Sequence, residues 1–168
     1  YLLSITMDHL PDKFWTVYGQ HDLPQHNLEL AYKSGIYVLE KAGRLTNIPI
    51  GNWGQKPKSD DIEIGFGLDD NFERKIYVWH NFTYIGKEPW PGCNAPKAYA
   101  LLEKYKQFDL ILTGDNHQSF TVRGPSGNLL VNPGSLMRQT AAQIDFQPRV
   151  FLWYAEDNLV EVVEVPIE

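Results

Sequence analysis

The stretch from Leu110 to His117 constrains the fold more strongly than any other part of this 168-residue chain. Its aliphatic residues 110–112 predict a short strand that is buried on both faces of a sheet. Gly114 follows this strand and predicts a sharp turn of the backbone, because glycine carries no Cβ. Asp115 and His117 then fall on the loop at the strand's carboxyl end, where open α/β sheets bind ligands. Oxygen and nitrogen donors so close together predict a metal-binding loop, and an Asp-Asn turn beside a surface histidine is the alternative.

Length and composition predict one folded domain over residues 1–168. Hydrophobic residues make up 43% of the chain and charged residues 21%, which is typical of a globular protein. No apolar run approaches the ~20 residues of a membrane helix. The lone Cys93 can form no internal disulfide, which fits a reducing compartment. We therefore expect a cytoplasmic protein without a membrane partner.

Acidic residues outnumber basic ones by 21 to 15, and the net charge is −6. A protein that grips nucleic acid by neutralising phosphates usually carries a basic stripe, and no cluster of Lys or Arg stands out in this sequence. A non-enzymatic nucleic-acid clamp is therefore disfavoured. An acidic enzyme can still act on a phosphate ester when bound cations reverse the local field.

Strands and helices are expected to alternate through the first two-thirds of the chain, with hairpins at its end. Strands are expected at 14–18, 36–39, 62–66, 75–79 and 108–113, and helices near 28–34 and 96–106. Turn residues between apolar runs predict two hairpins, within 119–131 and 149–165. A helix is expected to end at Leu10, and the polar stretch 51–61 is expected to be a mobile loop. This order predicts an α/β fold of layered type with a mixed sheet.

Three of the expected strands end in residues that are common metal ligands. Gln20 and His21 follow the strand at 14–18, and His80 follows the strand at 75–79. Asp115 and His117 follow the strand at 108–113. A single histidine after a strand is more often a surface residue than a ligand. Three such strand ends at one edge of a sheet predict a common site.

The order of these blocks resembles that of the calcineurin-like metallophosphoesterases. That family carries a Gly-Asn-His-Asp/Glu block, an isolated histidine, a Gly-His-x-His block and often a trailing Asn-Pro-Gly-Ser turn. The similar blocks in this chain are Gly19-Gln20-His21-Asp22, His80, Gly114-Asp115-Asn116-His117 and Asn132-Pro133-Gly134-Ser135. The segments 19–24, 89–93 and 134–138 look most like the DNA-repair exonuclease-like branch found in bacteria and their phages. The resemblance implies a layered α-β-β-α sandwich with mixed sheets.

The resemblance implies a phosphoesterase with two divalent metal ions. Gln20, His80 and Asp115 match ligands of the second metal, and His117 matches a ligand of the first. His21 matches the histidine that stabilises the transition state or protonates the leaving oxygen. Carboxylate and amide ligands suit Mn²⁺ or Mg²⁺ better than thiophilic ions, so we expect Mn²⁺ first, with Mg²⁺ or another divalent ion as the alternative.

Three further residues are candidates for the site. Arg138 could bind a substrate phosphate through two parallel hydrogen bonds, and a surface role is the alternative. Trp90 could stack on a base. Asp22 could orient a neighbouring group, although an acid at a turn is equally a structural feature. The implied substrate is a phosphoester in nucleic acid, and the implied partners are an ATPase subunit or further copies of the chain.

The family's first two blocks, Asp-x-His and Gly-Asp-x-x-Asp, have no counterpart before Gly19. In the family they supply the remaining ligands of the first metal and the carboxylate that bridges both ions. We therefore expect this chain to be the truncated, C-terminal portion of a phosphoesterase, with little activity by itself. A phosphomonoesterase or protein phosphatase is the nearest alternative. An inert scaffold that retains the fold is the alternative from a different class.

Overall fold

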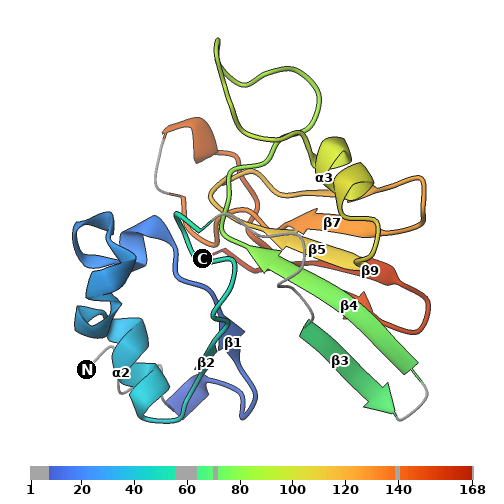
Figure 1. Cartoon of the computed structure of the whole chain (residues 1–168). Helices are drawn as coiled ribbons and strands as arrows, with labels where there is room; N and C mark the ends of the chain where they lie inside the picture. The colour runs from blue at the N-terminus through green and yellow to red at the C-terminus, as the bar shows by residue number, and fades with distance from the viewer. Residues whose placement is uncertain (1–7, 56–63, 70–71, 139–140, 168) are drawn as a thin grey trace. The chain divides into compact units, whose positions relative to one another are not determined.

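The chain is a mixed α/β protein with several sheets, as the sequence predicts (Figure 1). The computed structural model describes residues 8–55, 64–69, 72–138 and 141–167. It divides the chain into two compact units, unit 1 at residues 1–62 and unit 2 at residues 63–168. Each unit is described by itself, and the single domain expected over residues 1–168 stays a prediction.

Unit 1 is built from short strands and helical turns. They are β1 (Trp15–Thr16), η1 (Gln20–Asp22), η2 (Pro24–His26), η3 (Leu28–Lys33), α2 (Gly35–Lys41) and β2 (Thr46–Asn47), where η marks a 3₁₀ helix. β1 pairs in parallel with β2, and the buried side chain of Asn52 extends this pairing. The side-chain oxygen of Asn52 accepts hydrogen bonds from the Tyr18 amide at 2.7 Å and from Asn47 Nδ2 at 3.0 Å. The strand predicted at 14–18 is confirmed at its centre, and the helix near 28–34 is confirmed in the tighter 3₁₀ form.

The strand predicted at 36–39 is wrong, because these residues lie in helix α2. The side chain of Ser34 caps this helix by accepting a hydrogen bond from the backbone amide of Tyr37 at 3.1 Å. Leu39 is buried while Val38 is exposed. A short apolar run fits a strand or a helix equally well, so the cap decides between them.

Unit 2 is organised around a five-stranded sheet with the strand order β3-β4-β5-β7-β6. Its strands are β3 (Ile64–Asp69), β4 (Phe72–Trp79), β5 (Leu110–Thr113), β6 (Phe120–Arg123) and β7 (Leu129–Asn132). β4, β5 and β7 run parallel to one another, while β3 and β6 run antiparallel to their neighbours at the two edges. The predicted mixed sheet, its strands near 75–79 and 108–113 and its hairpin within 119–131 are confirmed.

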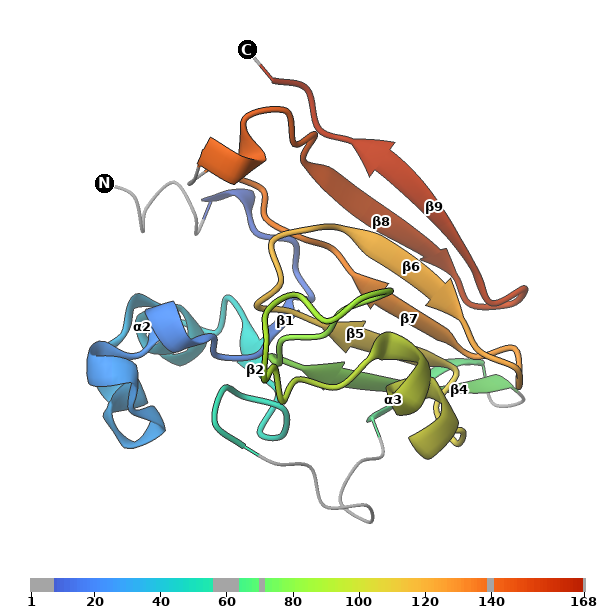
Figure 2. The ribbon, with the colours of Figure 1, turned by 90° about the horizontal axis from the view of Figure 1, so that it is seen from above.

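Both faces of this sheet are covered, as Figure 2 shows. Helix α3 (Ala98–Lys104) lies on one face, and the hairpin of β8 (Arg149–Tyr154) and β9 (Leu159–Glu164) lies on the other. The hairpin packs Phe151, Trp153 and Val160 against a buried cluster of Ile76, Leu110, Leu129 and Val131. Coverage of both faces explains why β5 and β7 are apolar at nearly every position. The helix predicted near 96–106 and the hairpin predicted within 149–165 are confirmed.

Some predictions fall partly outside the described residues. These are most of the helix expected to end at Leu10, the later half of the loop at 51–61 and the first two residues of the strand at 62–66. The rest of that strand lies in β3. No helix in the described part of the chain combines the length and the apolar character that crossing a bilayer requires.

Tyr77 offers a test of packing on the α3 face. Its ring is fully buried and lies 5.4 Å from the ring of Phe108, and its hydroxyl has no hydrogen-bond partner within the described residues. Burial, followed by a smaller effect of Tyr105, raises the pKa of this hydroxyl far above its usual value. Because Tyr77→Phe removes an unsatisfied buried group and keeps the ring, we expect the free energy of unfolding to stay unchanged or to rise by about 1 kcal/mol. Urea denaturation measures this, with the exposed Tyr99 changed to Phe as the control. A clear loss of stability in Tyr77→Phe alone would contradict the expectation.

Candidate functional site

The carboxyl ends of three parallel strands lie at one edge of the sheet in unit 2. Trp79 at the end of β4 pairs with Thr113 at the end of β5, and Val131 near the end of β7 pairs with Leu112. His80, the loop 114–117 and the turn 132–135 therefore leave the sheet side by side. Ligands of open α/β sheets bind at such an edge.

Gly114 lies against the imidazole ring of His80. A Cβ at this position would stand 3.0 Å from His80 Nδ1, so a side chain would press on the ring. The sharp turn expected at Gly114 is made by the next residue, since Asp115 has a φ of +71°. Aspartate adopts this left-handed conformation more readily than most residues. Glycine therefore serves the close approach of His80 here rather than an unusual φ, and a larger residue would oblige the His80 ring to shift.

The loop after β5 is held in place by Asn132. This residue is fully buried, and its side-chain amide donates to the carbonyl oxygens of Asn116 and Gln118 at 2.7 and 2.6 Å. Its side-chain oxygen accepts a hydrogen bond from Thr113 Oγ1 at 3.2 Å. Asn132 thereby ties the end of β7 to the end of β5 and fixes the residues on both sides of His117.

The turn after β7 approaches the same loop closely. Gly134 has a φ of +78°, and a Cβ there would stand 2.8 Å from the carbonyl oxygen of His117 and 2.9 Å from the amide nitrogen of Ser119. The amide of Ser135 donates to that same His117 oxygen at 3.1 Å. The sequence resemblance gave the Asn-Pro-Gly-Ser turn no role, and the structure shows that it positions the loop. The signal in the sequence was this turn standing directly after an apolar strand.

Gln20, His21 and Asp22 lie in unit 1, in the 3₁₀ turn after β1. Gln20 Nε2 lies 3.4 Å from Nε2 of the exposed His21, and the Gln20 carbonyl oxygen lies 2.8 Å from His26 Nδ1. The carboxylate of Asp22 accepts a hydrogen bond from the Gly19 amide at 2.8 Å. This contact closes the turn and supports the structural alternative for Asp22. The roles expected for Gln20 and His21 stay predictions.

Arg138 and Trp90 both present accessible side chains in unit 2. Arg138 is exposed, and its Nε donates to the carbonyl oxygen of Phe146 at 2.8 Å. Trp90 is 48% exposed, and its ring packs edge-on against the ring of Phe82 with centroids 5.0 Å apart. Their expected substrate contacts stay predictions.

A cleft of about 520 Å³ opens beside His117. Its lining includes Asp145, Arg149 and Phe146, the residue that accepts the hydrogen bond from Arg138. Nε of Arg149 is buried and has no hydrogen-bond partner in the part of the chain that the structure describes, while Nη2 lies 3.7 Å from Glu164. The described lining thus holds one guanidinium and one carboxylate, together with the polar groups of His117, Gln118, Gln143 and Gln147.

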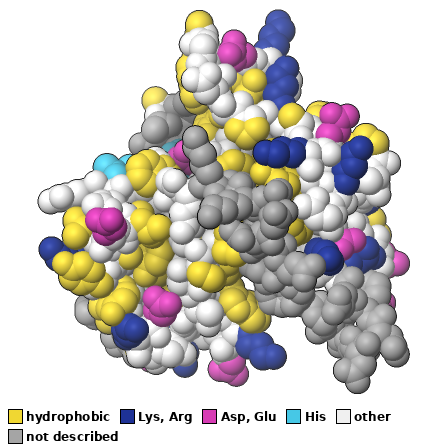
Figure 3. Space-filling view, in the orientation of Figure 1, with side chains coloured by type: hydrophobic (Ala, Val, Ile, Leu, Met, Phe, Trp, Pro, Cys, Tyr) yellow, Lys and Arg dark blue, Asp and Glu magenta, His cyan; other side chains and the backbone are white. Residues whose placement is uncertain are grey.

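Charges on the face drawn in Figure 3 are mixed. On that face, the described Lys and Arg side chains are interspersed with acidic ones and form no continuous stripe. Such a surface does not hold nucleic acid by charge alone. Recognition of a phosphate would instead depend on a local site such as the cleft beside His117.

Unit 2 contains donor types that suit a divalent ion. His80, Asp115 and His117 offer two imidazoles and a carboxylate at neighbouring strand ends. Within the described residues, no three His, Cys, Asp or Glu side chains converge on one point. Gln20 belongs to unit 1, so the expected ligand set of Gln20, His80 and Asp115 stays a prediction.

Comparison with protein-family models, with curated proteins and with solved structures found no significant match to this chain. The fold and the site define a mixed α/β protein whose parallel strands end in imidazole and carboxylate side chains. What the protein does is therefore argued from these residues.

Proposed function

We propose that this chain contributes to a two-metal phosphoesterase of the calcineurin-like type, acting as a phosphodiesterase or nuclease on DNA. One observation carries the proposal: His80, the loop of Asp115 and His117 and the turn 132–135 leave adjacent parallel strands at one edge of one sheet. The order of these blocks along the chain is the order in the family that the sequence resembles. The mixed sheet, covered on both faces, is compatible with the layered sandwich of that family.

In this proposal, His80 and Asp115 would hold the second divalent ion and His117 the first, while Gln20 of unit 1 keeps the ligand role that the resemblance implies. Mn²⁺ is the first candidate, because carboxylate and amide oxygen donors suit it better than thiophilic ions. When bound, such ions supply Lewis-acid stabilisation of the negative charge on a phosphoryl oxygen. Asn132 holds the backbone on both sides of His117 through the carbonyl oxygens of Asn116 and Gln118.

Proton transfer is assigned to His21 of unit 1, and phosphate binding is assigned to two arginines of unit 2. His21 would protonate the leaving oxygen, because an imidazole can act as a general acid. Arg149 lines the cleft beside His117, and Arg138 is bonded to Phe146 in the lining of the same cleft. Both guanidinium groups can bind phosphate oxygens.

The test uses the protein expressed from the whole coding sequence of its gene. With Mn²⁺ it is expected to hydrolyse bis(4-nitrophenyl) phosphate and single-stranded DNA. Asp115→Asn and His117→Asn are each expected to lower kcat/KM at least 100-fold, which corresponds to about 2.7 kcal/mol of transition-state stabilisation. Asn94→Ala changes an exposed loop residue and serves as the control, with activity expected to be unchanged.

Substrate choice separates this proposal from its alternatives. Hydrolysis of phosphopeptides or phosphomonoesters alone would replace the nuclease by a phosphatase. If metal ions stimulate the hydrolysis of none of these substrates, the proposal is refuted and an inert scaffold is favoured.

A further inference from the structure

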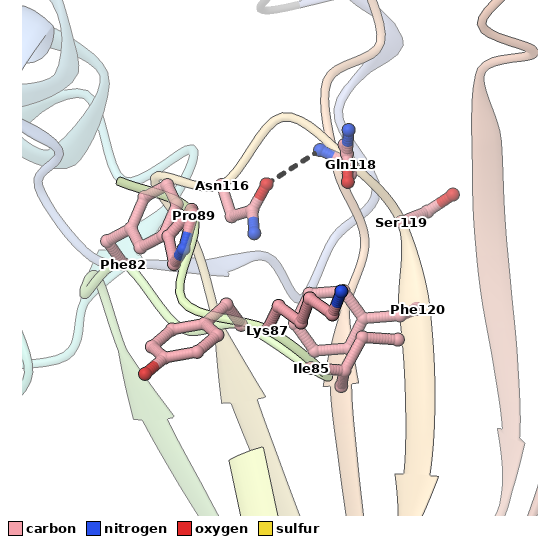
Figure 4. Close-up of a pocket in the computed structure, with 9 residues that line it drawn as sticks. Phe82, Ile85, Lys87, Pro89, Asn116, Gln118, Ser119 and Phe120 are labelled. Atoms are coloured by element: carbon pink, nitrogen blue, oxygen red, sulfur yellow. Dashed lines mark hydrogen bonds between the residues drawn. The ribbon is translucent and has the colours of Figure 1, made fainter. Parts of the chain in front are cut away.

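A second cleft, of about 440 Å³, lies next to the same loop (Figure 4). Its lining comes from two segments, 82–89 after β4 and 116–120, which runs from the loop after β5 to the first residue of β6. In Figure 4, Asn116 and Gln118 lie at the top of this space, and Lys87, Ile85 and Phe120 lie below it. Gln118 and Ser119 line both this cleft and the cleft beside His117, so the two clefts meet at the loop. Its volume is within the range of small-molecule sites.

Aromatic rings form much of the apolar lining of this second cleft. Phe82 and Phe120 are partly buried, and Tyr84 is only 8% exposed. The ring of Trp90 packs edge-on against the ring of Phe82, with the centroids 5.0 Å apart. Fixed aromatic faces of this kind stack on nucleobases whatever the base sequence.

The polar groups of the second cleft favour an anionic ligand that also offers hydrogen bonds. Lys87 is the one charged residue in the described lining, and no carboxylate accompanies it, although the whole chain has a net charge of −6. The neighbouring Glu88 lies outside the lining. The side-chain amide of Gln118 is exposed and makes no hydrogen bond within the described part of the chain, so it can pair with a base edge.

Two other polar side chains shape the second cleft. The side chain of Asn116 donates to the carbonyl oxygen of Thr83 at 2.8 Å and accepts from the backbone amide of Gln118 at 3.0 Å. These two hydrogen bonds hold the side chain in place at the edge of the cleft. Burial, followed by the effects of Cys93 and Glu88, raises the pKa of the Tyr84 hydroxyl.

We infer that this second cleft binds the base of one unpaired nucleotide, with Lys87 pairing to that nucleotide's phosphate. The inference rests on the proposed function, because the cleft adjoins the loop that carries Asp115 and His117. It names the substrate class more closely, since the space suits a single nucleotide and not a base pair. The favoured substrate is DNA with a single-stranded end.

The inference is tested by binding without added metal, so that it does not depend on catalysis. Fluorescence anisotropy compares a labelled thymidine pentanucleotide with an abasic pentamer of equal charge, on the whole protein at fixed salt. The thymidine strand is expected to bind at least tenfold more tightly. Phe82→Leu is expected to remove most of this preference, whereas Lys87→Gln is expected to weaken both strands severalfold. The controls are Tyr99→Leu and Lys104→Gln, which change exposed residues of α3 outside the cleft.

The outcomes separate this inference from the proposed function. Metal-dependent hydrolysis together with equal affinity for the two strands would overturn the nucleotide site and leave the phosphoesterase standing. Base-dependent binding that Phe82→Leu abolishes, without hydrolysis, would support the site and count against the phosphoesterase. Because Phe82→Leu could also disturb folding, NMR of the unaltered protein with thymidine monophosphate provides a second test. Amide shifts confined to residues outside 82–89 and 116–120 would overturn the inference.

Discussion

Replacing Asn132 by aspartate is expected to lower the free energy of unfolding of unit 2 by about 4 kcal/mol. The substitution keeps the shape of the side chain, but it removes both donations to the carbonyl oxygens of Asn116 and Gln118. It also places a carboxylate, fully buried, against these two oxygens, and no cation compensates it among the bonds that Asn132 makes. Urea denaturation followed by circular dichroism measures the loss.

Asn94→Asp is the control for this change, because it alters charge and shape equally at an exposed loop residue. Its effect is expected to stay below about 0.5 kcal/mol. Hydrogen exchange at the Ser135 amide gives a local readout, since this amide donates to the carbonyl oxygen of His117. Exchange there is expected to accelerate in Asn132→Asp. Equal stability losses in the two variants would refute the anchoring role of Asn132.

Gly134→Ala is expected to destabilise unit 2 by about 3 kcal/mol, of which the left-handed backbone accounts for about 1–2 kcal/mol. The remainder comes from collision, because the new Cβ would stand 2.8 Å from the His117 carbonyl oxygen and 2.9 Å from the Ser119 amide. Both contacts involve backbone atoms, which cannot swing aside as the end of a long side chain does. Thermal and urea unfolding both report the change.

Gly127→Ala separates the two contributions to this loss. Gly127 has a φ of +83°, and a Cβ there would meet no atom within 4 Å. This variant is therefore expected to show the backbone cost alone, about 1–2 kcal/mol. If Gly134→Ala lowers the free energy of unfolding by no more than Gly127→Ala does, the turn 132–135 is not in close contact with the backbone of His117 and Ser119.

Much of unit 2 could be predicted from local sequence patterns. The apolar runs that became β4, β5 and β7 are bounded by glycine and polar residues, so length and composition identify them as strands. The hairpin of β6 and β7 follows from the turn residues 124–127. The run 36–39 of unit 1 was predicted wrongly, because a short apolar run fits a strand and a helix equally well, and Ser34 caps a helix there.

The candidate site was only partly predictable. The positions of His80 and Asp115 at strand ends follow from strand boundaries, which the sequence shows. The need for glycine at Gly114 depends on contact with His80, a residue on a neighbouring strand, and no local pattern reveals such a contact. The role of Asn132 likewise depends on two carbonyl oxygens that reach it only after β5 and β7 have paired.

Because Gln118 and Ser119 line both clefts, binding in one cleft can affect binding in the other. Gln118 and Ser119 border both spaces, and the peptide oxygen of Gln118 is bonded to Asn132. A ligand that shifts Gln118 and Ser119 when it binds in one cleft therefore changes the affinity of the other cleft for its own ligand. Linkage requires the effect to be reciprocal, so that each ligand alters the binding of the other by the same factor. If the hydrogen bond from Asn132 prevents Gln118 and Ser119 from shifting, this factor is close to one and the two clefts bind independently. Weakening that hydrogen bond would couple the two binding events.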